Sequence, residues 1–128
     1  MKEVVLGELR VVAERQGADR IEVLLTGKSS SRDAGRALLP VFEKLMAAAL
    51  EDRRTLVLHF EKLEYFNSST IAALVQFIRT AQQTGVSMIV RYDAALKWQA
   101  MSFEALRRAL KPFEAQGGTV LRFLGTAE

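Results

Sequence analysis

Apolar and polar residues alternate along the chain with two different periods, and these periods divide it into strands and helices. Two apolar-rich segments within residues 8–27 flank residues 16–19, which have turn composition, so we expect an antiparallel hairpin. From residue 55 onward, short apolar runs alternate with longer segments in which apolar residues recur at helical spacing. This order of strands and helices is typical of a mostly parallel sheet covered by helices.

The first helical segment lies between the hairpin and this alternation. In residues 36–52, Val41, Leu45, Ala48 and Ala49 recur at the spacing of one helical face. Pro40 lies inside the segment and predicts either a kink or, as we favour, a helix that starts with this proline at its first position.

The remaining bounds follow from the same periods and from glycines that suit helix ends. We expect strands at residues 56–60, 87–91 and 119–124 and helices at 68–84 and about 96–115, with Gly85 and the pair Gly117-Gly118 at helix C-termini. The sequence thus predicts the α/β class, with a mixed, mostly parallel sheet of about five strands and three main helices.

Composition limits the possible classes of protein. With 128 residues, 49% of them hydrophobic, the chain can bury one core, and no linker or repeat divides it, so we expect a single domain over residues 1–128. No apolar run approaches the ~18 residues of a membrane span, and acids interrupt the first residues, unlike a signal peptide. We expect a soluble, cytoplasmic protein that does not bind membranes.

Charge and the rare residue types exclude several kinds of chemistry. The net charge of +3 is spread along the chain and indicates no nucleic-acid partner. With no cysteine and a single histidine, His59, the chain lacks the ligands of a typical zinc site and the partners of a catalytic triad. We therefore expect no metal and no cofactor.

Two short patterns resemble parts of ligand-binding or catalytic sites. Gly27-Lys28-Ser29 matches the end of a phosphate-binding loop, but Glu22 stands where that loop requires glycine, so we exclude it. Glu61 and Asp93 follow predicted strands, where α/β domains bind ligands, and His59 precedes the first of them. A small-ligand or enzymatic site built on these strand-end acids is the alternative function; solvated loop acids and a packed strand histidine are the simpler explanation.

The predicted helix at 96–115 is amphipathic. Arg107, Arg108 and Lys111 lie opposite its apolar residues, a pattern that docking on the chain's own sheet explains. A partner protein or an anionic membrane surface is the alternative for these basic residues.

The sequence Asn67-Ser68-Ser69-Thr70 forms a polar corner between a predicted strand and the helix that follows. Asn67 suits the N-cap, because its side-chain oxygen can accept from an amide two or three residues on. Capping does not explain the adjacent hydroxyls, which would lie on an exposed loop accessible to a kinase. A phosphate there would meet the free amides and positive dipole end of the helix.

The helix after this corner offers a surface for a partner. We expect Ile71, Leu74, Val75 and Ile78 to face the core. The other face then carries small, uncharged side chains, which permit close approach of another protein. These outward residues are Ala72, Ala73, Gln76 and Thr80.

The order of elements and the hydroxyl-bearing corner resemble the STAS domains, the anti-sigma factor antagonists of partner-switching systems, over roughly residues 8–124. Their corner typically reads Asp-Ser-Ser-Gly or Asp-Ser-Thr-Gly, and its first serine is phosphorylated. On this chain Asn67 stands at the Asp position, Ser68 at the phospho-acceptor and Thr70 at the Gly position.

The corner is also similar to that of the SiaC-type STAS-like regulators of biofilm signalling, which reads Tyr-Phe-Asn-Thr-Ser-Ser. Tyr65, Phe66 and Asn67 match it, and the family's phospho-threonine falls on Ser68. The Tyr-Asp pair that ends at Asp93, the proline in the first helix and the Gly-x-Ser turn at residues 27–29 are further similar features.

The resemblance implies a switch without catalytic activity. The unphosphorylated protein would bind an anti-sigma kinase or, in the SiaC-like version, a diguanylate cyclase; a serine/threonine kinase would release it and a phosphatase would reset it. Ser68 is the expected acceptor, ahead of Ser69 and Thr70. The expected partner-binding residues are Tyr65, Ala72, Ala73, Gln76, Thr80 and Asp93.

Overall fold

A computed structural model describes residues 2–113, 115–116 and 119–126. Within these residues, three α-helices and eight strands form an α/β structure, and one 3-10 turn follows the last helix. In chain order the elements are β1 (Lys2–Leu6), β2 (Leu9–Gln16), β3 (Arg20–Ser29), α1 (Ala34–Asp52), β4 (Thr55–His59), β5 (Leu63–Phe66), α2 (Ser68–Thr84), β6 (Met88–Asp93), α3 (Lys97–Leu110), η1 (Lys111–Phe113), β7 (Ala115–Gln116) and β8 (Thr119–Thr126).

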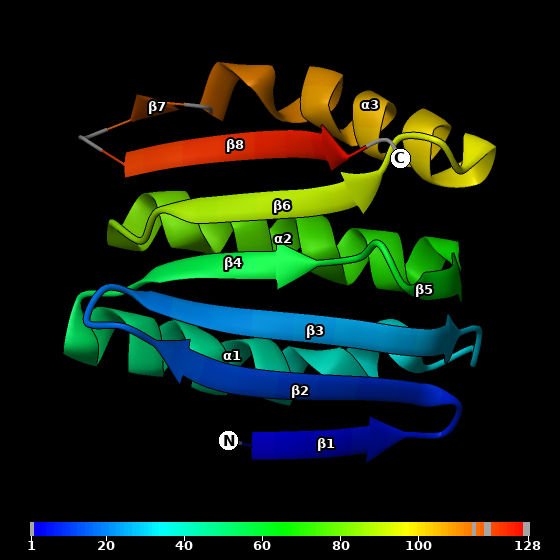
Figure 1. Ribbon diagram of the computed structural model, residues 1–128, viewed down its shortest axis with the longest axis horizontal. Helices are drawn as coiled ribbons and strands as arrows, with labels where there is room; N and C mark the ends of the chain where they lie inside the picture. The colour runs from blue at the N-terminus through cyan, green and yellow to red at the C-terminus, as the bar shows by residue number, and fades with distance from the viewer. Residues whose placement is uncertain (1, 114, 117–118, 127–128) are drawn as a thin grey trace.

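The sheet is mixed, as the sequence predicts. Its order is β1-β2-β3-β4-β6-β8-β7, with β5 paired to the far end of β3. The pairs β1–β2 and β2–β3 are antiparallel, whereas β3, β4, β6 and β8 run parallel. In Figure 1, α1 and α2 lie behind the sheet, and α3 lies along its β8 side. The predicted hairpin, mixed sheet and three helices are confirmed, and the sheet has more strands than predicted.

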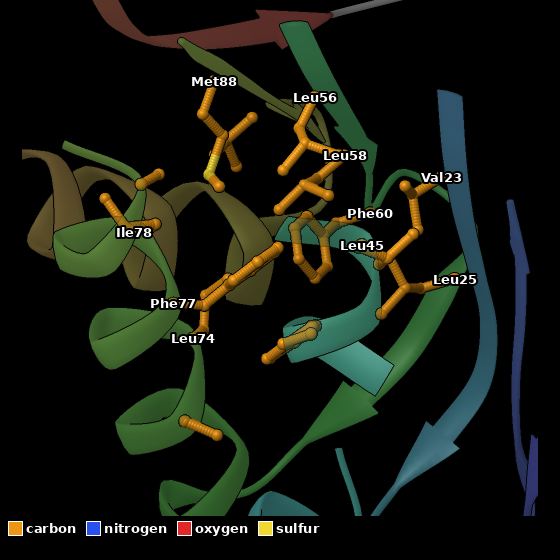
Figure 2. Packing of buried hydrophobic residues seen from close by; sticks show 14 of the residues in the cluster. Val23, Leu25, Leu45, Leu56, Leu58, Phe60, Leu74, Phe77, Ile78 and Met88 are labelled. Carbon is orange, nitrogen blue, oxygen red and sulfur yellow. The ribbon is translucent and has the colours of Figure 1, made fainter. Parts of the chain in front are cut away.

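The core fills the space between the sheet and the helices. Leu56, Leu58 and Phe60 alternate along β4 and its end and are at most 1% exposed, and Leu74 and Ile78 of α2 are fully buried (Figure 2). Each such side chain contributes about 1.5–3 kcal/mol by leaving water. This packing fixes α2 on the sheet and therefore fixes the corner at its start. Among the described residues, no helix is long and apolar enough to cross a membrane.

Helix α1 begins earlier than the sequence predicts. It starts at Ala34, and Pro40 lies inside it, so the prediction of a helix that starts at Pro40 is wrong. Gly35 and Leu38 are buried, and this packing stabilises the turns before the proline. Pro40 has no backbone N–H, so the Arg36 carbonyl oxygen lacks the helical hydrogen bond that residue 40 would otherwise donate. Because Pro40 and Arg36 are both exposed, water can reach this region.

The other departures are short strands and helix ends. The sequence prediction missed β1, β5 and β7. Strands β5 and β7 have only four and two residues, and in β1 the adjacent Val4 and Val5 break the alternation. Helix α3 ends at Leu110, before the predicted residue 115, because Pro112 follows and only a 3-10 turn continues. Gly85 ends α2 in the left-handed conformation, as predicted, whereas Gly117 and Gly118 lie outside the described residues.

Candidate functional site

The polar corner is held at the end of β3 by a break in the sheet. At Gly27 the register of β3 shifts, and beyond this point β3 pairs with β5 instead of β4. Gly27 has a φ of 87°, and a Cβ there would lie 2.0 Å from the Glu8 carbonyl oxygen, so only glycine fits. The Gly-Lys-Ser segment therefore lies close to the turn at Glu8 and pairs with β5, in which Glu64 is the extra, bulged residue. It places Phe66 beside Ser29 and Asn67 directly after them.

Asn67 caps α2 and also binds the neighbouring loop. Its Oδ1 accepts hydrogen bonds from the Thr70 amide and the Thr70 hydroxyl, both at 3.0 Å. Its Nδ2 donates to the Ser31 carbonyl oxygen at 2.8 Å. An aspartate could cap the helix in the same way, but it has no N–H to donate to that carbonyl. This donation gives a structural reason for asparagine at a position where antagonists carry aspartate.

Thr70 is a structural residue in this fold. Its side chain is buried, and its hydroxyl lies 2.6 Å from the Ser29 hydroxyl. Ser29 is only 2% exposed, so the two hydroxyls satisfy one another inside the protein. A kinase therefore has no access to Thr70 in the folded chain.

Ser69 connects the starts of α1 and α2. Its Oγ accepts a hydrogen bond from the Gly35 amide at 2.9 Å. A Cβ on Gly35 would lie 2.2 Å from the Ser69 carbonyl oxygen, so the two helices approach as closely as only glycine permits. Gly35 thus belongs to the packing of this corner, and the sequence analysis missed it. Its signal would be a glycine in the first turn of a helix, a position that disfavours glycine unless close packing requires it.

Ser68 differs from its two neighbours. It is the first residue of α2 and is exposed. Its hydroxyl forms no hydrogen bond within the part of the chain that the structure describes. The first turn of α2 contains no acidic residue, so an anion attached here would meet the positive end of the helix without a like charge in that turn.

The predicted partner surface is largely exposed, with one correction. Tyr65 is 47% exposed, Ala72 and Gln76 are exposed, and Thr80 is half-buried. Ala73 was predicted to face outward, but it is only 5% exposed, so this prediction is wrong.

The reason for the correction is the position of α1. Ser69 and Phe77 of α2 both contact α1, through the Gly35 amide and through a ring stack of Phe77 with Phe42 at 4.2 Å. Ala73 lies one turn from each of them and therefore faces α1 as well. A small residue here allows the two helices to pack closely. Two of the residues predicted to face the core, Ile71 and Val75, are only partly buried.

Asp93 lies at the end of β6, close to the second strand-to-helix corner. Its Oδ1 accepts from the Ala95 amide at 2.9 Å, and its own amide donates to Gln99 Oε1 at 2.7 Å. Gln99 is fully buried, and its Nε2 donates to the carbonyl oxygens of Phe60 at 2.7 Å and Leu63 at 3.0 Å. Gln99 thus joins the loop before β5 to the start of α3, and the sequence analysis did not identify it.

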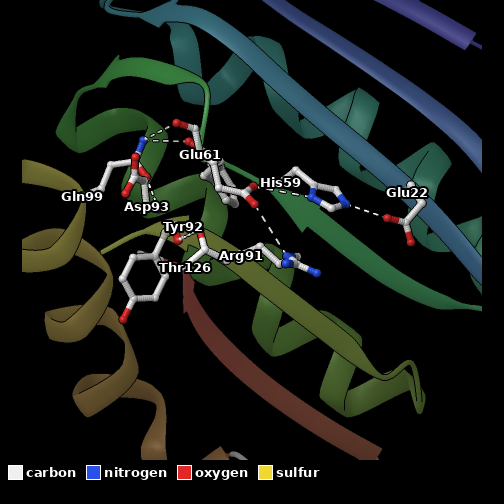
Figure 3. A network of polar contacts seen from close by, with 9 residues as sticks. Glu22, His59, Glu61, Arg91, Tyr92, Asp93, Gln99 and Thr126 are labelled. Atoms are coloured by element: carbon white, nitrogen blue, oxygen red, sulfur yellow. Dashed lines mark hydrogen bonds and ion pairs between the residues drawn. The ribbon is translucent and has the colours of Figure 1, made fainter. Parts of the chain in front are cut away.

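His59 and Glu61 belong to a cluster of charged side chains. His59 Nε2 lies 2.6 Å from Glu22 Oε1, and its Nδ1 lies 3.5 Å from Glu61 Oε1. Glu61 Oε2 lies 3.6 Å from Arg91 Nε (Figure 3). Asp93 forms its hydrogen bonds with the Ala95 amide and with Gln99, so its side chain lies outside this charged cluster. No group of His, Asp and Glu among the described residues could hold a metal ion.

Comparisons with known proteins give a fold and no close relative. No protein-family model matches the sequence, and no curated protein matches it. Among solved structures, one similar chain belongs to the complex of the diguanylate cyclase SiaD with its activator SiaC from Pseudomonas aeruginosa. The identity is 16%, the TM-score is 0.59, and the match covers 96% of this chain and 99% of that one.

Two further matches are structures of SpoIIAA. The phosphorylated form of this Bacillus cell fate determinant is 14% identical, with a TM-score of 0.56 and coverage of 92% of each chain. The unphosphorylated form of SpoIIAA, called an anti-sigma factor antagonist, is 13% identical, with a TM-score of 0.55 and coverage of 87% of this chain and 86% of that one. At these identities the likeness concerns the fold, and the chain has a STAS-like fold.

Proposed function

We propose that this protein is a regulatory protein-binding module of a partner-switching system and that phosphorylation of Ser68 controls it. The observation that carries the proposal is the contrast among three adjacent hydroxyls. Thr70 is buried against Ser29, Ser69 binds the Gly35 amide, and Ser68 is exposed at the first position of α2. Two of these hydroxyls therefore form contacts within the fold, and the third, that of Ser68, is accessible for phosphorylation.

A phosphate on Ser68 would change the surface without disturbing the core. It adds about −1.5 to −2 charges at neutral pH. The amides at the start of α2 and the dipole of this helix favour an anion at that position. Because Ser68 lies outside the buried network of Asn67 and Thr70, the modified chain keeps its fold and differs in what it binds.

The proposed docking surface begins beside Ser68 and extends along α2. It consists of Tyr65, Ala72, Gln76 and Thr80, with Asp93 at the neighbouring strand end, and it omits the buried Ala73. The exposed tyrosine supplies a large apolar contact with a polar tip, and the small residues of α2 permit close approach. A phosphate beside this surface would repel a partner whose facing surface is acidic. Against an apolar partner, the phosphate would lose its water on binding, and this desolvation would weaken the complex.

The proposed partners are a serine/threonine kinase, a phosphatase and an effector that the unphosphorylated form binds. The similar folds support this set, because SpoIIAA is an anti-sigma factor antagonist with a phosphorylated form and SiaC is the activator of a diguanylate cyclase. An anti-sigma kinase and a diguanylate cyclase are thus the two effector classes to test. In this role the chain is not an enzyme and acts in the cytoplasm.

The test of the modification uses intact mass. The purified chain is incubated with ATP and with each serine/threonine kinase encoded near its gene, and we expect the addition of one phosphate. Ser68→Ala should abolish the addition, whereas the matched control Ser69→Ala should retain it. Phosphate that persists on Ser68→Ala would place the modification elsewhere and contradict the proposal.

The test of the switch measures binding of an effector identified by co-purification. Phosphorylated chain and Ser68→Asp should bind at least about tenfold more weakly than the unmodified chain, a loss of about 1.4 kcal/mol. Tyr65→Ala should weaken binding without any modification. Equal affinity of modified and unmodified chains would reject the switch even if Ser68 accepts phosphate.

A further inference from the structure

A groove separate from the Ser68 corner opens between strand β1 and helix α1. In Figure 1, α1 lies behind β2 and β3, and β1 continues the sheet beyond it. The groove has a cavity volume of about 780 Å³. Small-ligand sites typically measure about 300–1,000 Å³, so the size suits a ligand rather than a stray gap in packing.

Both walls of the groove are aliphatic. On the helix side, Ala37, Val41, Leu45 and Ala48 form a stripe at the spacing of one helical face. From the first to the last of them this stripe is about 16 Å long at the rise of an α-helix. On the sheet side, the alternating residues of β1 and β2 supply Val4, Leu6, Val11 and Ala13.

The charges of the groove gather toward one end. Lys2 pairs in register with Ala13, so it lies at the end of β1 farthest from Leu6. Lys44 lies one helical turn before Ala48, toward the same end.

Two further charged residues line the groove at this end, Glu14 and Arg15. Arg15 is already engaged, because its Nη2 lies 2.8 Å from Asp52 Oδ2. Lys2 and Lys44 form no ion pair within the described part of the chain. Two lysine ammonium groups are therefore available for an anion at this end, against the single carboxylate of Glu14, and the rest of the groove is apolar.

We propose that this groove binds a medium-chain fatty acid, with the alkyl chain along α1 and the carboxylate near Lys2 and Lys44. Burial of the alkyl chain supplies the affinity, and the ammonium groups fix its direction. The segregation of charge favours this ligand over a helix of another protein. An amphipathic helix carries charges along its whole length, whereas the groove offers them at one end only.

Calorimetric titration of the whole chain with dodecanoate, below its micelle concentration, tests the proposal. Dodecanoate is the probe because its extended chain is comparable in length with the helical stripe. We expect one saturable site. Dodecylammonium, which has the same chain and the opposite charge, should bind at least about tenfold more weakly. Absence of saturable binding, or equal binding of the two amphiphiles, would overturn the proposal.

Two pairs of variants locate the site. Ala37→Phe fills the groove from an exposed position of α1, and Ala47→Phe adds the same group at an exposed position of α1 outside the groove. Only the first should abolish dodecanoate binding. Lys44→Glu should weaken it about tenfold, whereas Lys97→Glu on α3 should not change it. An unchanged thermal transition without ligand shows that each variant is folded. If the folded variants Ala37→Phe and Ala47→Phe bind dodecanoate equally well, the ligand binds elsewhere and the assignment is wrong.

Discussion

The two strand-to-helix corners at this end of the molecule use polar residues in opposite ways. Before α2, Asn67 caps the helix and its neighbours supply three hydroxyls, one of which is exposed. Before α3, Leu96 occupies the N-cap without a side-chain hydrogen bond, and the buried Gln99 supplies the polar contacts from inside the helix. In the second corner, the structure accounts for the polar side chains of Asp93 and Gln99 through their hydrogen bonds.

This difference separates structural polarity from functional polarity. A buried amide such as that of Gln99 is required because the backbone groups around it would otherwise lose their partners. An exposed serine such as Ser68 is not required by the fold, since water satisfies its hydroxyl equally well. Substitutions in the α3 corner should therefore lower the free energy of unfolding strongly. In the α2 corner the loss should depend on the residue, and the following predictions test this order.

Gln99→Leu should have the largest effect on stability. The substitution leaves the Leu63 carbonyl oxygen and the Asp93 amide without their side-chain partner in a buried region. It also removes one of the two donors to the Phe60 carbonyl oxygen, which keeps the Leu63 amide at 3.0 Å. At about 1–3 kcal/mol for each unsatisfied group, and with some relaxation, the free energy of unfolding should fall by about 4 kcal/mol. Urea denaturation measures the loss. The control Gln83→Leu, at an exposed position of α2, should stay within about 0.5 kcal/mol.

Gly35→Ala should rank second. The added methyl group would overlap the Ser69 carbonyl oxygen, so α1 and α2 must separate where Ser69 Oγ accepts from the Gly35 amide. Overpacking of this kind costs about 1–3 kcal/mol, and thermal unfolding should show it.

Gly85→Ala is the control for the effect of alanine at a glycine. A Cβ there meets nothing within 4 Å, and only its φ of 87° is unfavourable. We expect about 1 kcal/mol from this conformational cost. A larger loss for Gly85→Ala than for Gly35→Ala would show that close helix contact does not explain Gly35.

Asn67→Asp should have a smaller but informative effect. The carboxylate keeps both acceptor contacts with Thr70 but cannot donate to the Ser31 carbonyl oxygen, 2.8 Å from Asn67 Nδ2. The gain from a negative charge at a helix N-terminus partly offsets this loss, so we expect a net destabilisation of about 1 kcal/mol. Asn67→Ala, which removes the cap entirely, should cost more, about 2 kcal/mol. Equal stability of Asn67→Asp and the parent chain would remove the structural reason for asparagine.

Sequence patterns predicted those parts of the molecule that depend on local periodicity. Alternation along residues 56–60 and the glycine at 85 depend on nearby residues, and both predictions hold. The burial of Ala73 depends on α1, which lies far away in the sequence. The spacing of apolar residues that placed Ile71 and Val75 in the core could therefore not predict that Ala73 is buried. Tertiary packing selects which of two similar apolar faces is buried.

The candidate site shows the same limit. The Asn67 cap could be predicted because its partner lies three residues away. Gly35, Ser29 and Gln99 could not, because each contacts a residue more than thirty positions distant. The resemblance ranks Ser68 ahead of Ser69 and Thr70, but only the three-dimensional arrangement gives a physical reason for that order.

Ser68 should tolerate substitution best, and this tolerance is the sharpest contrast between the two corners. Its exposed hydroxyl has no partner in the described chain, so Ser68→Ala should change the free energy of unfolding by less than about 0.5 kcal/mol. Ser68→Asp should stabilise the fold by about 0.3–1 kcal/mol through the dipole of α2, an effect that salt reduces. Ser69→Ala, the neighbouring control, should lose about 1 kcal/mol with its bond to the Gly35 amide. Urea denaturation at low and high salt measures all three variants. A large loss in Ser68→Ala would mean that the fold requires this hydroxyl, and Ser68 would then have the same structural role as Gln99.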